Sequence, residues 1–137
     1  NHCPYVKAVL DRLIAILADY SDRGVRIVGI NSNDSSLYPD DSFENMVSLV
    51  SERSLNFVYL HDESQEVARA YGAQCTPDIF VYDADRRLAY HGRIDDNWQD
   101  ESLVTRRELR EALDSLLAGE KSLSEQNPSM GCSIKWK

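Results

Sequence analysis

Residues 1–30 read NHCPYVKAVLDRLIAILADYSDRGVRIVGI, and this stretch decides the fold class. Its apolar side chains recur at the i, i+3, i+4 spacing of a helix with one buried stripe, which predicts a helix over residues 4–19. Pro4 suits the first turn, where a missing N–H costs nothing. Gly24 is a stop signal, and residues 25–30 form a Val- and Ile-rich run typical of a strand buried on both faces. A helix followed so closely by a strand indicates an α/β protein.

The rest of the chain continues this alternation of helices and strands. Capping-box patterns predict the starts of three more helices, at Asp41-x-x-Glu44, Asp62-x-x-Gln65 and Thr105-x-x-Glu108. Further strands are expected over residues 57–60, 78–82 and 88–91. A polar connection of hairpin length joins the last two, so the order predicts parallel strand pairs first and an antiparallel hairpin last. No strand precedes the first helix, so we expect either residues upstream of Asn1 or a sheet that lacks one member.

Composition narrows the class of protein. The chain has 137 residues, a formal net charge of −8 and 42% hydrophobic residues, which suits one domain with a real core. An acidic chain without a basic stripe argues against a nucleic-acid partner, because phosphate affinity comes mostly from clustered Lys and Arg. The arginine pairs at 86–87 and 106–107 are expected to be solvated. No apolar run approaches the roughly 20 residues of a membrane span, so no membrane association is expected.

Three cysteines are spread along the chain, at Cys3, Cys75 and Cys132. This odd, dispersed set is unlike the dense, even set of a disulfide-stapled secreted domain, so free or reactive thiols are expected. A cytoplasmic location is favoured, but any targeting segment would lie upstream of Asn1, so the location stays open.

His2-Cys3-Pro4 places a thiol at the start of the first predicted helix. Unpaired N–H groups and the positive end of the helix dipole stabilise an anion there, and such a cysteine can have its pKa lowered to roughly 3.5–7.5. The alternative is an inert, buried cysteine beside a solvent-facing histidine. Thr76-Pro77 directly precedes a strand, where proline is common, although X-Pro bonds in tight turns are sometimes cis.

A cysteine at the N-terminus of the first helix, a β-α-β-α order and a Thr-Pro that opens a hairpin resemble the thioredoxin fold with its first strand absent. The match is closer to one bacterial branch of the superfamily of alkyl hydroperoxide reductases and thiol-specific antioxidant proteins, the redoxins. The similar segments span almost the whole chain: residues 1–7 (NHCPYVK), 30–34 (INSND), 71–78 (YGAQCTPD), 90–96 (YHGRIDD) and 131–136 (GCSIKW). The resemblance implies a mixed central sheet flanked by helices, a thioredoxin-like domain over residues 1–119 and a docking tail over residues 120–137.

The resemblance also implies roles for four residues. In this branch Asn-His-Cys is commonly preceded by another cysteine, the attacking member of a C-N-H-C redox pair, although some relatives carry a different residue there. Cys3 would then be the resolving cysteine, and His2 would favour the thiolate and place the couple between about −120 and −270 mV. Pro77 would be cis and face the cysteines. The Thr76 backbone would pair with an extended substrate segment.

The other two cysteines are candidates for a second redox site. Cys75 lies two residues before Pro77, and Cys132 lies in the tail segment that is similar to the branch. The two could form a second redox pair, or both could be buried and inert, because cysteines whose Cα atoms lie more than roughly 7 Å apart cannot be bridged without movement.

Other polar residues carry weaker signals. Metal-ligand types are supplied by His2, His61, His91 and the three cysteines. C-x₂-C and H-x₃-H spacings are absent, so no metal site is predicted, and His61 and His91 are expected at the surface. The acidic pairs Asp40-Asp41 and Asp95-Asp96 lie near turn signals and are interpreted as solvated loop charges.

We therefore predict a thiol–disulfide oxidoreductase that acts on protein or small-molecule disulfides and thiols and needs no cofactor. The enzymatic rival is a peroxiredoxin-like peroxide reductase, whose P-x-x-x-T-x-x-C pattern is absent. The hypothesis from another class is a catalytically silent thioredoxin-fold module that binds a partner through Thr76-Pro77 or through residues 134–136. The sequence leaves the substrate, the oligomeric state and the direction of electron flow open.

Overall fold

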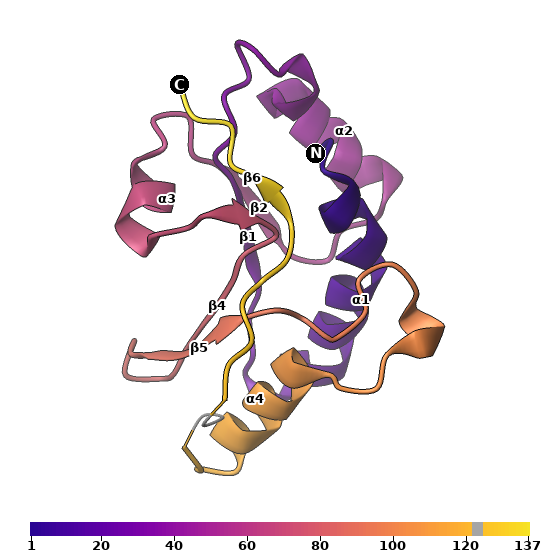
Figure 1. The fold of residues 1–137 in the computed structure, drawn as a ribbon, viewed down its shortest axis with the longest axis vertical. Coiled ribbons are helices and arrows are strands. Elements are labelled where there is room, and N and C mark those ends of the chain that lie inside the picture. The colour runs from indigo at the N-terminus through magenta and orange to yellow at the C-terminus, as the bar shows by residue number, and fades with distance from the viewer. Residues whose placement is uncertain (122–124) are drawn as a thin grey trace.

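The computed structural model describes residues 1–121 and 125–137. Its helices are α1 (Pro4–Tyr20), α2 (Phe43–Glu52), α3 (Glu66–Tyr71) and α4 (Glu108–Leu117), with short 3₁₀ turns η1 (Ser21–Arg23), η2 (Pro39–Asp41) and η3 (Glu101–Leu103). Its strands are β1 (Val28–Asn31), β2 (Val58–His61), β3 (Cys75–Thr76), β4 (Ile79–Tyr82), β5 (Leu88–Gly92) and β6 (Cys132–Ser133). The chain is mixed α/β, as predicted (Figure 1). None of the helices in the described part of the chain is both long and apolar enough to cross a bilayer.

The strands form two-stranded pieces in the described residues. β1 pairs with β2 in parallel, and β4 pairs with β5 as an antiparallel hairpin, which confirms the predicted order. β3 and β6 form a further antiparallel pair between segments far apart in the sequence. Across residues 1–121 and 125–137 no ladder of hydrogen bonds joins these pieces, so the predicted central sheet is present only as separate segments.

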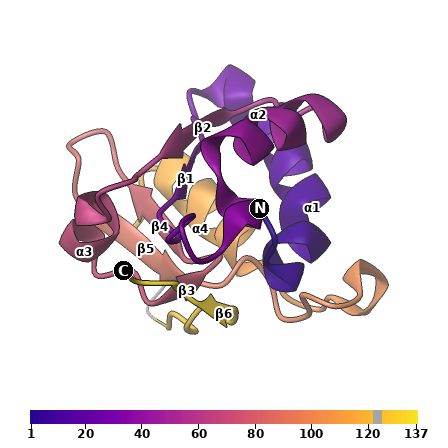
Figure 2. The same ribbon diagram turned by 90° about the horizontal axis from the view of Figure 1, so that it is seen from above.

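The core lies on one face of the β4–β5 hairpin, where α1 and α4 pack together. It contains Val9, Ile16 and Tyr20 of α1, Tyr90 of β5, Ile94, and Leu109, Ala112 and Leu113 of α4. Ile79 and Val81 of β4 pack against this cluster, whereas Phe80 and Tyr82 alternate to the opposite face and contact Tyr71 of α3. The hairpin therefore has α1 and α4 on one side and α3 on the other (Figure 2).

The β1–β2 pair corrects the expectation of a strand buried on both faces. Val28 is 53% exposed, and its partner Val58 is 57% exposed. Alternation places these side chains on one face, while Asn31 lies on the other face and is buried. A short Val- and Ile-rich run is compatible with burial on one face or on two, and the surrounding elements decide which applies.

Two predicted helix starts are also corrected. Ser42, not Asp41, caps α2, because its Oγ accepts a hydrogen bond from the Asn45 N–H at 3.2 Å. Thr105 does not cap α4, because its hydroxyl donates to Asp96. In both cases the residue predicted as a cap instead makes side-chain hydrogen bonds to residues outside the helix: Asp41 to His2 and Asn33, and Thr105 to Asp96.

The loop after β5 is tied to α1 by a buried ion pair. Both carboxylate oxygens of Asp95 accept hydrogen bonds from Arg12, at 2.9 and 3.0 Å, and both side chains are almost fully buried. Arg12 also donates to the carbonyl oxygens of Asn97 and Trp98. Asp95 is therefore not a solvated loop charge, contrary to the sequence interpretation, and it helps to fix the loop that follows the hairpin.

Candidate active site

Cys3 lies at the N-terminus of α1 and is buried, with 2% of its surface exposed. Its carbonyl accepts the first helical hydrogen bond, from the Lys7 N–H at 3.0 Å, and Pro4 opens the helix as predicted. The Cys3 sulfur lies 3.2 Å from the carbonyl oxygen of Thr76 and 3.0 Å from the sulfur of Cys132. Two segments from much later in the sequence therefore meet at the start of the first helix.

The three thiols differ in acidity. Burial raises the pKa of Cys3, but hydrogen bonds from the side chains of Cys132 and Thr76 and from the backbone of the first helical turn outweigh burial and lower that pKa below the ordinary thiol value. The pKa of Cys132 is raised by burial and by its contact with Cys3. Burial and the charge of Asp78 raise the pKa of Cys75 to about 11. Cys3 is therefore the group most able to carry the negative charge.

Thr76 and Pro77 form the second part of the site. The peptide bond between them is cis, and the Thr76 carbonyl faces the Cys3 sulfur. The Thr76 hydroxyl is buried and faces the Cys3 sulfur. In the β3–β6 register Thr76 lies opposite Cys132, so the tail strand occupies the backbone edge that the sequence assigned to a substrate.

The His2 ring is held by a buried aspartate. Oδ2 of Asp41 lies 2.5 Å from His2 Nδ1, Oδ1 accepts from the His2 backbone N–H at 3.2 Å, and the Asn33 amide donates to Oδ2 at 2.9 Å. Burial raises the pKa of Asp41, but hydrogen bonds from the Asn1 nitrogen and Asn33 outweigh it and hold that pKa below its usual range. The ring also stacks on Tyr38, with ring centroids 5.8 Å apart. These contacts fix the ring orientation at the start of α1.

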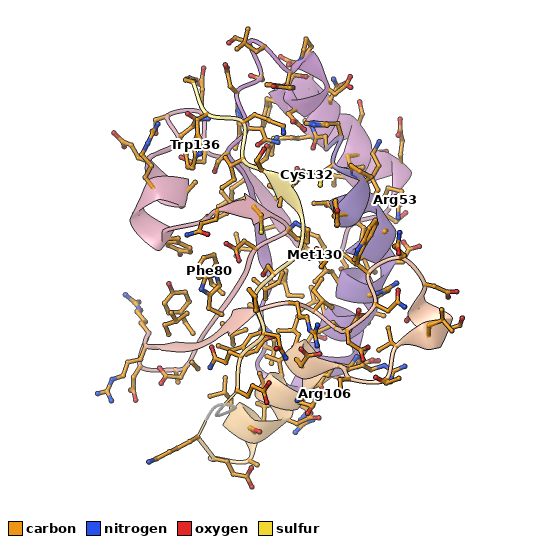
Figure 3. All side chains as sticks on the ribbon, in the orientation of Figure 1. Arg53, Phe80, Arg106, Met130, Cys132 and Trp136 are labelled. Carbon is orange, nitrogen blue, oxygen red and sulfur yellow. The ribbon has the colours of Figure 1, made fainter. Side chains whose placement is uncertain are left out.

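The tail is attached to the body of the protein on both sides of Cys132. Before it, Ser129 Oγ donates to the Gly92 carbonyl at 2.7 Å, and after it, the Lys135 N–H donates to Asn33 Oδ1 at 2.9 Å. Figure 3 shows the labelled Met130, Cys132 and Trp136 along this segment, with Cys132 beside the N-terminal end of α1. The position of Cys132 is therefore set by contacts on each side of it.

Comparison with known proteins gives the family. The family model described as AhpC/TSA family matches residues 1–91. The chain belongs to the AhpC/TSA family. This family comprises thioredoxin-like redox proteins and implies a thioredoxin-like fold for the α/β arrangement around Cys3.

Two solved structures are similar to this AhpC/TSA chain over its whole length. An uncharacterized conserved protein from Geobacillus kaustophilus is 47% identical with a TM-score of 0.94, and the match covers 100% of this chain and 73% of that one. A hypothetical protein from Sinorhizobium meliloti 1021 is 43% identical with a TM-score of 0.94, and the match covers 100% of this chain and 75% of that one. Among proteins with curated descriptions, none matches.

Asp41 of the AhpC/TSA chain is a site residue that the sequence interpretation missed. Asp40 is exposed, as expected for a loop charge, but Asp41 is fully buried. A usable signal was the pair of asparagines at the end of β1, because the Asn31 amide donates to the Asp41 carbonyl and the Asn33 amide donates to its carboxylate. Buried amide side chains need hydrogen-bond partners, and Asp41 supplies one to each of these asparagines.

Cys75 does not share the contact between the other two thiols. Its sulfur lies 3.6 Å from the Pro77 carbonyl oxygen and 3.9 Å from that of Ser129. The sulfur that Cys132 contacts at 3.0 Å is that of Cys3. Of the two cysteines considered for a second redox pair, Cys132 therefore contacts Cys3, and Cys75 does not share this contact.

The other histidines lie outside this site. His91 Nε2 is 2.8 Å from an Asp78 carboxylate oxygen, and its side chain is 40% exposed. His61 Nε2 is buried and unpartnered among the described residues, unlike the surface position expected. In residues 1–121 and 125–137 no three His, Cys, Asp or Glu side chains are grouped to hold a metal ion.

Proposed function

We propose that this AhpC/TSA protein is a thiol–disulfide oxidoreductase of the C-N-H-C-P-Y-V-K branch that exchanges disulfides with protein or small-molecule thiols. The observation that carries the proposal is the Cys3 sulfur at a helix N-terminus, 3.2 Å from the Thr76 carbonyl oxygen. Exchange needs a thiolate, and the lowered pKa of Cys3 supplies one. It also needs a site for an extended substrate, and the backbone edge at Thr76, which pairs with the tail strand β6 in this structure, is of the kind that accepts an extended segment.

Each site residue has a role in this proposal. Cys3 is the resolving thiol: it attacks the protein-side sulfur of a mixed disulfide between another cysteine and the substrate, the bond to the substrate sulfur breaks, and the substrate leaves as a thiolate that takes up a proton. His2 tunes the site, and Asp41 is a positioning residue that orients the His2 ring. Thr76 and Pro77 bind substrate. No organic cofactor is needed, because the electrons move with the sulfur–sulfur bond.

The test measures exchange with the complete chain. A peptide that carries a glutathione mixed disulfide is incubated with glutathione, and release of the peptide thiol is followed over time. Wild-type protein is expected to accelerate the release, and Cys3→Ser is expected to lower the rate, because Cys3 no longer resolves the mixed disulfide. Ser51→Ala, on the exposed surface of α2, is the control and keeps the wild-type rate. Equal rates for Cys3→Ser and wild type would refute exchange at Cys3.

The same proteins distinguish the rival functions. Consumption of hydrogen peroxide that depends on Cys3, without disulfide exchange, would assign the chain to peroxide reduction. Inactivity in both assays, with retained binding of the peptide, would assign it to the silent binding class. Exchange that depends on Cys3 supports the oxidoreductase.

A further inference from the structure

We propose that Cys132 is the redox partner of Cys3, so that the C-terminal tail carries the second thiol of the active site. The inference rests on the proposed exchange activity and specifies the thiol pair that performs it. Both cysteines are free thiols, and their sulfurs lie 3.0 Å apart although 129 positions separate them in the sequence. Because a disulfide joins sulfurs at about 2.0 Å, a small side-chain movement would complete the bond.

The backbone holds the two sulfurs together. Thr76 lies opposite Cys132 in the antiparallel β3–β6 pair, and the Thr76 carbonyl is also the group that contacts the Cys3 sulfur. The tail strand therefore takes the place of an extended substrate and presents Cys132 to Cys3 as a substrate would present its own cysteine. Figure 1 shows that the tail passes β4 and β5 before it reaches β6, the strand that pairs with β3.

The tail is fitted to this position. Gly131 passes so close to β3 that a Cβ atom there would overlap the Thr76 carbonyl oxygen. Beyond Cys132, Ile134 is buried, and the Lys137 N–H donates to Gln65 Oε1 at 3.0 Å. These contacts restrict the tail on both sides of its cysteine, so the two thiols are held in proximity and the loss of freedom on forming a disulfide is small.

Accessibility assigns different tasks to the two thiols. Cys3 is 2% exposed, whereas Cys132 is partly exposed. An external thiolate therefore attacks the Cys132 sulfur of the Cys3–Cys132 disulfide, the sulfur–sulfur bond breaks, and its electron pair leaves on Cys3. A second external thiolate attacks the external sulfur of the mixed disulfide, and Cys132 leaves and takes up a proton. In sum, two external thiols are oxidised to one disulfide, and the protein disulfide is reduced to two thiols.

The reverse sequence oxidises the protein with a disulfide substrate and uses Cys3 as the resolving nucleophile. The acidity of Cys3 suits its own step in each direction. The lowered pKa of Cys3 makes it the better leaving group when the internal disulfide opens, and it increases the fraction of Cys3 that is the attacking thiolate when the disulfide closes.

The test maps disulfides in the complete chain. Reduced protein is equilibrated in buffers of graded glutathione to glutathione-disulfide ratio, quenched with acid, alkylated and digested, and the peptides are identified by mass. Wild type and Cys75→Ser are expected to yield a Cys3–Cys132 linked peptide with one midpoint potential. Cys3→Ser is expected to lose the link and to accumulate glutathione on Cys132. Ser133→Ala, an exposed neighbour in the tail, keeps the link.

The outcomes separate this inference from the proposed function. Glutathione on Cys3 without any Cys3–Cys132 link, or a disulfide from Cys3 to any other cysteine, overturns the pair but leaves exchange at Cys3 in place. Absence of any disulfide on Cys3 at every ratio overturns both. The disulfide map of the wild-type protein decides between these outcomes by itself, so the result does not depend on the folding of a variant.

Discussion

Cys3 has an acidity that its place at a helix N-terminus does not explain alone. The helix start favours the thiolate, but burial opposes it, and burial is the largest single influence on its pKa. The contact with Cys132 is the largest influence in the opposite direction. A residue near the end of the chain therefore helps to decide the chemistry of a residue near its start.

Replacing Cys132 by alanine tests this dependence. Loss of the Cys132 thiol removes a contact that favours the Cys3 thiolate, so the pKa of Cys3 should rise. The pH dependence of Cys3 alkylation by iodoacetamide, followed by peptide mass, gives the midpoint. Ser133→Ala should leave the midpoint in place, and an unmoved midpoint in Cys132→Ala would show that Cys132 does not stabilise the thiolate.

Asp41 makes a pH-dependent contribution to stability. Its pKa in the folded protein is lower than in the unfolded chain, so the unfolded chain binds more protons as the pH falls through this range. The stabilisation is complete above the pKa of aspartate in the unfolded chain, about 3.9, and is lost as the pH falls through the pKa of Asp41 in the folded protein. Asp41→Asn should cost about 1–3 kcal/mol at neutral pH and less in acid.

Urea unfolding of Asp41→Asn at neutral pH and at a series of pH values that falls well below the ordinary aspartate pKa of about 3.9 measures this contribution. Asp40→Asn, at the exposed neighbouring position, is the matched control and should behave as wild type. The pH profile of Cys3 alkylation is recorded on the same variants, because loss of the His2 orientation should move it and a purely structural role should not. An equal loss of stability at every pH value would contradict the assignment.

At the scale of the element, β6 shows how a two-residue strand can be placed accurately. Its ladder with β3 is too short to hold it, so its position depends on neighbouring contacts, such as that of Lys135 with Asn33. Gly131 permits the close approach to β3, and this glycine is required for space, because no side chain fits against the Thr76 carbonyl.

Gly131→Ala should therefore lift the tail from β3. Overlap of the new methyl group with the Thr76 carbonyl is expected to cost about 1–3 kcal/mol of stability. It is also expected to expose the Cys3 side chain, which is only 2% exposed in the wild-type structure. The rate of Cys3 alkylation under denaturant-free conditions and the urea midpoint report the two effects. Ser133→Ala should change neither quantity, and slow alkylation of Cys3 in Gly131→Ala would indicate that another part of the structure shields the thiol.

At the scale of the whole molecule, two segments that are 129 positions apart in the sequence meet at one site. The N-terminal end of α1 and the C-terminal tail enclose the Cys3 sulfur, and the intervening elements supply the surface on which both lie (Figure 2). A covalent link between Cys3 and Cys132 would close almost the entire chain into one loop. Cross-links that close long loops restrict the unfolded chain most.

The oxidised protein should consequently be more stable than the reduced protein, by roughly 2–4 kcal/mol. Urea unfolding after equilibration with glutathione disulfide, compared with unfolding in excess reductant, measures the difference. Cys132→Ala should unfold at the same urea concentration under both conditions. Equal stability of oxidised and reduced wild type would count against a bridge across the molecule.

The sequence by itself determined the local features of this protein. The i, i+3, i+4 periodicity with Pro4 predicted α1, the polar segment between two apolar runs predicted the β4–β5 hairpin, and the alternation of helices and strands predicted an α/β chain. These features depend on neighbours within a few positions, and local hydrophobic periodicity and turn residues are sufficient to specify them. The residues of the family motifs could likewise be identified from the sequence, in their order along the chain.

Only the tertiary structure decided which of those residues meet. Asp41 and Asp95 looked like loop charges, yet one holds His2 and the other pairs with Arg12, because burial of a charge depends on what the fold places around it. Cys132 lay in a polar tail without periodicity, and its contact with Cys3 comes from strand pairing between segments far apart in sequence. A long-range backbone pairing leaves no repeat in the local sequence, so the partner of Cys3 became visible only in the folded chain.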